Sequence, residues 1–198
     1  LNLNQYSPQT LDGLLADTAA TFQASKIPAY TLTVVCAFIY ERYRNQLIND
    51  HDRNAVEAVI ALAPPLHQVA ERVRAAAAFA QMPEAASLAA ANKRIGNLLK
   101  KAEGEIGAVN DAALVEPAEK ALAAAIAALR PQAEAQLAAG DFAANLRTLA
   151  QAREPVDAFF ADIMVMAEDP AVRANRLALL GQLHTLMNQV ADISRLAQ

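Results

Sequence analysis

The stretch PEAASLAAANKRIGNLLKKA, residues 83–102, decides the fold class of this chain. Leu88, Ile95 and Leu99 recur at intervals of seven and four residues, which is the spacing of one face of an α-helix. Alanine, leucine and lysine fill most other positions, and all three favour a helix by intrinsic propensity. Proline at position 83 is typical of a helix start, where its missing N–H would have no partner in any case. The stretch therefore predicts an amphipathic helix that ends near residue 102.

The rest of the chain repeats this pattern, with proline or aspartate at each helix start and an apolar stripe after it. The predicted helices begin near Pro28, Asp52, Pro64, Pro83, Pro117, Asp141, Pro155 and Asp169. The last is expected to run through Ile193 to about Ser194, and Pro131 is expected to end or kink the helix that contains it. No stretch alternates convincingly as a strand does. The sequence predicts an all-α bundle of about eight to nine helices with short connections.

Composition narrows the class of protein further. Of the 198 residues 55% are hydrophobic, and the mean hydropathy is +0.14, which excludes an intrinsically disordered chain. A formal net charge of -4 argues against a protein that coats nucleic acid non-specifically, although it leaves room for a local basic face. The apolar run at residues 27–40 is too short to span a bilayer, so we expect no membrane partner.

Residue types that could carry catalysis are scattered. His51, His67 and His184 lie far apart and lack the spacing of zinc ligands. Cys36, the single cysteine, lies in an apolar run and is expected to be buried and inert. No glycine-rich phosphate loop or nucleophile elbow occurs, so we expect no catalytic residue, no metal site and no cofactor in this chain. Leu1 in place of an initiator methionine predicts a C-terminal piece of a longer protein, with the catalytic part elsewhere.

The helix predicted from residues 83–102 carries the strongest positive segment of this acidic chain. Helical spacing puts Lys93, Asn97 and Lys100 on one face, with Arg94 and Lys101 beside it, and no acidic residue interrupts residues 85–102. The negative end of the helix dipole explains the two last lysines equally well, but it does not explain Lys93 or Arg94. The candidate RNA-binding residues of this segment are Asn92, Lys93, Arg94, Asn97, Lys100 and Lys101.

A second candidate surface interleaves aromatic and arginine side chains at residues 38–45. Tyr40 and Arg44 share a helix face at a spacing of four, with Arg42 nearby, and stacked aromatic and guanidinium groups suit unpaired bases. Ordinary surface packing explains about half of this signal. We add Tyr40, Arg42 and Arg44 to the candidate RNA-binding residues.

Three segments resemble a known family. Residues 89–102 resemble the opening helix of the DALR-type anticodon-binding domain, residues 155–169 its internal signature, and residues 173–180 the start of its last helix. The particular residues in these segments look like those of the β subunit of the bacterial two-subunit glycyl-tRNA synthetases. Residues 31–42 and 52–62 also look like that subunit, and residues 191–194 resemble the C-terminus of that family. The resemblance implies two parts: an N-terminal helical segment, 1–84, packed on a DALR-like bundle, 85–198.

This resemblance implies a function. That family uses ATP and Mg to attach glycine to its tRNA, so the chain would bind the anticodon arm of the tRNA for glycine without catalysing the reaction. The α subunit, in an α2β2 assembly, would supply the chemistry, in the cytoplasm and with no DNA partner. Carried over by position, Arg94 and Phe160 are the best candidates for contacts with the anticodon. Gly96 stands where the family more often has serine, and Phe160 where the related arginine enzymes have tyrosine.

Two alternatives remain open at this point. An all-α bundle also suits a scaffold that docks protein partners through an exposed stripe. The related domain of an arginyl-tRNA synthetase is the other, although the first half of the chain resembles the glycine enzyme. A basic groove bordered by Phe160 would favour RNA, and an apolar patch of several hundred square ångströms would favour a protein partner.

Overall fold

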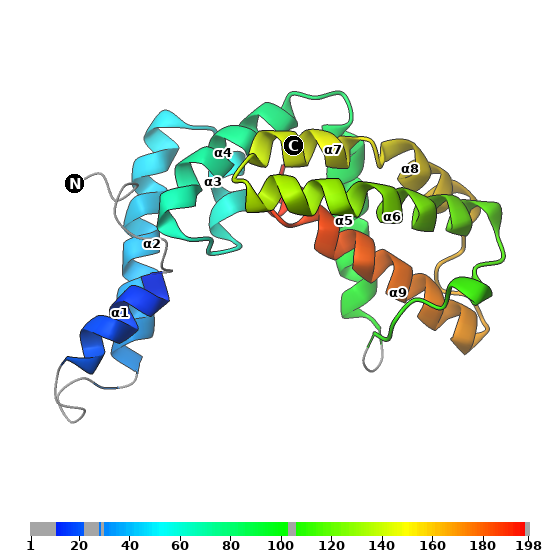
Figure 1. The fold of residues 1–198 in the computed structure, drawn as a ribbon, viewed down its shortest axis with the longest axis horizontal. Coiled ribbons are helices and arrows are strands. Elements are labelled where there is room, and N and C mark those ends of the chain that lie inside the picture. The colour runs from blue at the N-terminus through cyan, green and yellow to red at the C-terminus, as the bar shows by residue number, and fades with distance from the viewer. Residues whose placement is uncertain (1–10, 22–27, 29, 103–105, 197–198) are drawn as a thin grey trace.

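The computed structural model describes residues 11–21, 28, 30–102 and 106–196, and within these ranges the chain is helical with no strand. Figure 1 shows α1 and the start of α2 projecting from one end of a bundle formed by the later helices. The helices are α1 (Leu11–Ala20), α2 (Tyr30–Asp50), α3 (Arg53–Ile60), α4 (Leu66–Ala80), α5 (Ala85–Lys100), α6 (Pro117–Ala138), α7 (Phe142–Ala150), α8 (Arg153–Asp162) and α9 (Pro170–Met187). Two 3-10 turns, η2 (Asp111–Ala113) and η3 (Ile193–Arg195), complete the elements. The all-α prediction is confirmed.

Aspartate side chains begin three of these helices, as the sequence predicts. The Oδ1 atoms of Asp52, Asp141 and Asp169 accept hydrogen bonds of 2.9, 2.9 and 2.7 Å from backbone N–H groups in the first turns of α3, α7 and α9. Gly140, between α6 and α7, has a φ of 75°, a left-handed conformation that glycine adopts at little cost. Local chemistry therefore fixes where these helices start.

Two helices do not end where the sequence indicated. Pro131 does not end its helix, and the alternative expectation of a kink there stays a prediction. Helix α6 continues through Pro131 to Ala138. Pro131 is exposed, as is Ala127, whose carbonyl loses its partner, so water can replace the missing hydrogen bond. Helix α9 starts where predicted but ends at Met187, well before Ser194.

The chain beyond α9 turns back toward α3. The backbone N–H of Asp192 donates a 2.8 Å hydrogen bond to the carbonyl of Ala58. Val190 and Ile193 are buried by this turn, although both continue the apolar spacing of α9. The spacing of Val190 and Ile193 predicts a longer helix, but in the structure a turn buries the same two side chains.

The buried core is continuous from α3 to α9. Helix α6 contacts α7, α8 and α9, and α5 contacts α8, α9 and η3. Leu88, Ile95, Leu122 and Phe159 are among its fully buried side chains. Each such side chain contributes about 1.5–3 kcal/mol by leaving water. This core fixes α5 and α8 relative to each other, which matters for the site below.

Helix α4 packs on the later part of the chain through a buried arginine, Arg72. Nη1 of Arg72 donates hydrogen bonds of 2.7 and 3.2 Å to the carbonyls of Gln189 and Val190, and its guanidinium lies 4.5 Å from the centroid of the Phe142 ring. Burial lowers the pKa of Arg72.

The boundary between a segment 1–84 and a bundle 85–198 stays a prediction. Among the described helices none is long and apolar enough to cross a membrane.

Candidate nucleic-acid interface

The exposed face of α5 forms a shallow hollow of about 390 Å³. The residues that line it recur at intervals of three and four, so they form one stripe along the helix. They are Ala90, Lys93, Arg94, Asn97, Leu98 and Lys101. Four of the six predicted residues of this segment thus lie together, and Ala90 and Leu98 are lining residues that the sequence did not single out.

Helix α8 adds an aromatic side chain to this face. The guanidinium of Arg94 lies 4.3 Å from the centroid of the Phe160 ring, a cation–π contact. Phe160 is half-buried and packs its ring edge-to-face on the fully buried Phe159, with centroids 5.7 Å apart. Phe160 is therefore partly exposed beside Arg94. Of the two adjacent phenylalanines one belongs to the core and the other to the surface.

A hydrogen bond between side chains holds α8 against α5. Ser87 Oγ donates to Asp157 Oδ1 at 2.5 Å, and Arg153 lies 3.4 Å from the other oxygen of the same carboxylate. Ser87 lies two helical turns before Arg94, and Asp157 lies one turn before Phe160. Sequence reasoning missed this pair, although Ser87 shares a face of α5 with Arg94 and Asp157 shares a face of α8 with Phe160. The Ser87–Asp157 bond adds a polar contact between the two helices on the side where Arg94 meets Phe160.

Positive charge on α5 is not neutralised by the described part of the chain. Lys93, Arg94, Lys100 and Lys101 are exposed, and none of them forms a salt bridge with a described residue. Other arginines of the chain do pair: Arg176, for example, bonds Glu119 at 2.5 Å. The α5 face can therefore offer its charges to an anionic ligand.

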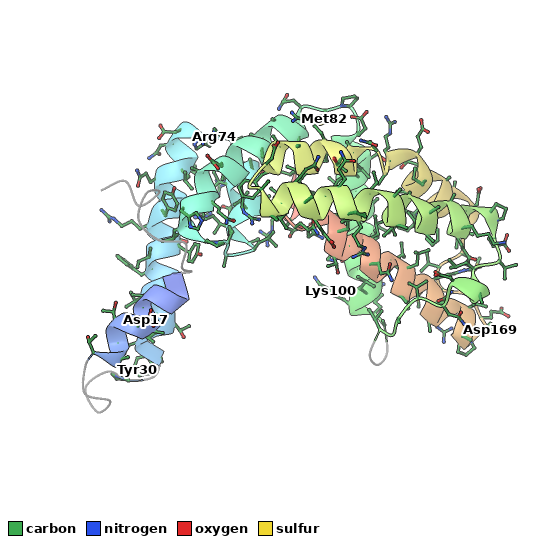
Figure 2. All side chains as sticks on the ribbon, in the orientation of Figure 1. Asp17, Tyr30, Arg74, Met82, Lys100 and Asp169 are labelled. Carbon is green, nitrogen blue, oxygen red and sulfur yellow. The ribbon has the colours of Figure 1, made fainter. Side chains whose placement is uncertain are left out.

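Lys100 lies at the edge of this face, at the C-terminal end of α5 (Figure 2). It does not line the hollow and lies instead toward His184 of α9. Burial lowers the pKa of His184, nearby Asp192 raises it, and Lys100 lowers it further; the net direction is down. Lys100 stays a predicted contact, separate from the hollow.

The structure corrects the prediction for Asn92. This side chain is fully buried, so it is not available to an RNA ligand. Its Nδ2 donates to Asn188 Oδ1 at 2.9 Å, and Asn188 Nδ2 donates back to Asn92 Oδ1 at 3.1 Å. Asn188 Nδ2 also donates to the carbonyl of His184 at 2.8 Å. Asn92 therefore joins α5 to the end of α9, because a buried amide needs such partners.

The candidate surface on α2 does not form as predicted. Tyr40 donates its hydroxyl to the carbonyl of Pro64 at 2.6 Å. Arg44 forms ion pairs with Glu57 and Glu41, and its hydrogen bond holds the pKa of Glu57 below its ordinary value, against the effect of burial. Both side chains are thus engaged in holding α2 to its neighbours, and the Tyr40–Arg44 pair is not an open stacking surface. Arg42 is exposed and lies in a separate hollow with Phe38.

Metal-ligating side chains do not converge in the described ranges, where no group of three or more His, Cys, Asp or Glu could hold an ion. The arrangement on α5 and α8 provides cations, an amide and a half-exposed aromatic ring. These groups bind phosphates and stack on unpaired bases.

Comparison with protein families matches residues 88–193 to the DALR anticodon binding domain. The chain belongs to this family. The matched region contains the α5 stripe and Phe160, whereas Tyr40, Arg42 and Arg44 precede it. The DALR assignment therefore covers the face where the predicted residues lie together.

Curated relatives extend the similarity beyond the DALR region. The chain is 50% identical over 190 residues to the glycine–tRNA ligase beta subunit of Methylobacillus flagellatus, across 94% of this chain and 27% of that protein. It is 48% identical over 198 residues to the same subunit of Thiobacillus denitrificans, across 98% and 28%. It is 60% identical over 144 residues to that of Leptothrix cholodnii, across 72% and 20%. The chain spans about a quarter of the length of the relatives that it matches.

Proposed function

We propose that this chain binds the anticodon arm of the tRNA for glycine, as part of the β subunit of a glycine–tRNA ligase. The DALR family supports binding at the anticodon arm, and the name of the relatives supports the glycine enzyme over the related arginine enzyme. The surface that would bind is the α5 stripe, with Phe160 of α8 beside it.

The contact of Arg94 with Phe160 carries this proposal. Anticodon loops expose unpaired bases, and proteins bind such bases by stacking them on aromatic rings and on arginine planes. The guanidinium carbon of Arg94 already lies 4.3 Å from the centroid of the Phe160 ring while the side chain stays exposed, so a base could bind it at a lower entropic cost than a free side chain would require. Lys93 and Lys101 flank the stack in the same hollow and would meet the phosphates on either side.

The catalytic steps would lie outside this chain. We propose that aminoacylation, with its ATP and Mg, belongs to the α subunit in an α2β2 assembly, and that the enzyme works in the cytoplasm. The relatives' designation as a beta subunit supports a partner subunit. The chain's own part is to hold the tRNA by its anticodon arm.

Titration of the chain with labelled RNA hairpins tests the proposal. We expect the anticodon stem-loop of the tRNA for glycine to bind more tightly than the same hairpin with a changed anticodon. The logarithm of its affinity should fall with the logarithm of salt concentration by about 0.7 for each loop phosphate neutralised. A hairpin copied from the acceptor stem is the control. Equal affinity for all three hairpins would reject anticodon recognition.

A further inference from the structure

One face of α2 exposes a row of large apolar side chains. Tyr30, Val34 and Phe38 follow one another at intervals of four and are 70%, 58% and 63% exposed. Cys36, on the opposite face of the helix, is buried, and α2 packs mainly against α1 and α3. Figure 2 shows Tyr30 at the end of α2 that projects away from the bundle.

This row has the pattern of a helix that docks on another apolar surface. Anchors at positions i, i+4 and i+8 are typical of a helix packed in a groove. The same face carries a single arginine, Arg42, in the hollow next to Phe38, whereas α5 carries four cations that form no salt bridge with a described residue. Glu41, which lines that hollow too, is bonded to Arg44. The chemistry of the α2 face is therefore that of a protein contact rather than an RNA contact.

The area that this row can bury indicates what kind of protein partner it binds. An aromatic side chain buries about 150–250 Å², so Tyr30 and Phe38 together offer about 300–500 Å², and Val34 adds a smaller area. A separate partner or a second copy needs about 800 Å² on each side. A segment of the same polypeptide needs less, because a covalent link raises its effective concentration to the millimolar range. In the Methylobacillus flagellatus relative the matched region is 27% of the length, so most of such a subunit lies outside it.

We infer that the α2 face docks an apolar helix face from the part of the β subunit outside these 198 residues, with a carboxylate of that helix against Arg42. This contact would join the DALR bundle to the rest of the subunit. It goes beyond the proposed tRNA binding and uses none of its residues.

Photo-crosslinking tests the inference in a subunit of the relatives' full length. Benzophenone placed at position 38 should crosslink within one polypeptide, to a peptide outside residues 1–198, at least tenfold more than benzophenone at the exposed position 33 of the same helix. Val34→Glu should lower that crosslink at least tenfold, and Thr33→Glu should leave it within twofold. Both variants change positions that face solvent in the 198-residue chain, so neither should alter its melting temperature by more than about 2 °C.

Four outcomes would overturn the inference: a crosslink to a second copy, to another subunit, to RNA, or an equally weak yield at both positions. The affinity for the anticodon stem-loop is a separate readout. Val34→Glu should leave it within twofold, so a failed crosslink with normal RNA binding rejects this inference alone. Loss of RNA binding in every variant and in the parent would instead reject the proposed function.

Discussion

Replacing Phe160 and Arg94 by alanine, singly and together, separates their roles in packing from their roles in RNA binding. A fully buried phenylalanine loses about 3–5 kcal/mol on truncation. Phe160 is half-buried, so about 2 kcal/mol of unfolding free energy is expected, including its edge contact with Phe159. Arg94→Ala removes an exposed cation–π contact of about 0.5–1 kcal/mol and should lower stability by no more than that.

The effect on RNA binding should be larger than the effect on stability for Arg94. Each side chain that stacks on a base contributes about 1–3 kcal/mol, or roughly 5- to 150-fold in affinity. Because Arg94 is held by Phe160, the double variant should bind little more weakly than the worse single variant. Fluorescence anisotropy with the anticodon stem-loop measures binding, and urea unfolding of the same preparations measures stability. Lys93→Ala, which touches no ring, is the matched control and should leave stability unchanged.

Two results would refute this reasoning. Additive losses of binding free energy in the double variant would mean that Arg94 and Phe160 act independently. A Phe160→Ala protein that unfolds at lower urea but binds RNA as the parent does would make Phe160 a packing residue only. In either case the shared site on α5 and α8 would have to be abandoned.

Three further variants test the packing around this site. Gly96→Ala should raise stability by about 0.5–1 kcal/mol, because glycine weakens a helix interior and the added Cβ would lie 3.5 Å from His184 Nε2; a lower melting temperature would contradict this. His184 has a lowered pKa, so the unfolded chain binds the proton first, and stability should fall as the pH drops below about 6.5 and level off below the folded pKa. Unfolding of His184→Gln should show less of this slope, and an unchanged slope would assign it to other groups. Burial raises the pKa of Glu119, but hydrogen bonds from Arg176 and from the backbone of Glu116 and Val115 lower it by more. Glu119→Ala should therefore cost about 3–5 kcal/mol in urea unfolding, because it leaves Arg176 largely buried without its partner, and a loss below 1 kcal/mol would contradict this.

Local chemistry made the helix starts predictable from sequence. Asp52, Asp141 and Asp169 bond the backbone within three residues of themselves, so nothing distant is needed to place them. The end of α9 was not predictable in this way. Val190 and Ile193 are apolar and correctly spaced, but the backbone bond from Asp192 to Ala58 turns the chain away from the helix. Periodicity reports that a residue is buried, and it does not distinguish a helix from a turn that buries the same side chains.

The candidate site was predictable in part for a related reason. Helical spacing alone brought Lys93, Arg94 and Asn97 together, because all three belong to one helix. The approach of Phe160 depends on packing across 66 positions of sequence, and only the family resemblance indicated it. The hydrogen bonding of the buried Asn92 depends on Asn188, at the end of α9, whose position was not predicted. The prediction included Asn92 because it adjoins Lys93 and Arg94 in the basic segment, although its spacing of four from Leu88 and three from Ile95 puts it on the buried stripe of the helix.

Reversing charge on the α5 face tests the central claim most directly. Lys93→Glu with Lys101→Glu should weaken binding of the anticodon stem-loop at least 100-fold at 0.15 M salt. Arg53→Glu with Arg74→Glu makes the same change of net charge on α3 and α4, where both side chains are exposed. At this salt concentration the screening length is about 8 Å, so charges away from the bound RNA have little effect, and we predict a loss of threefold or less for this control pair. Equal losses in the two pairs, or an α5 pair that binds as the parent does, would contradict the claim that this face holds the tRNA.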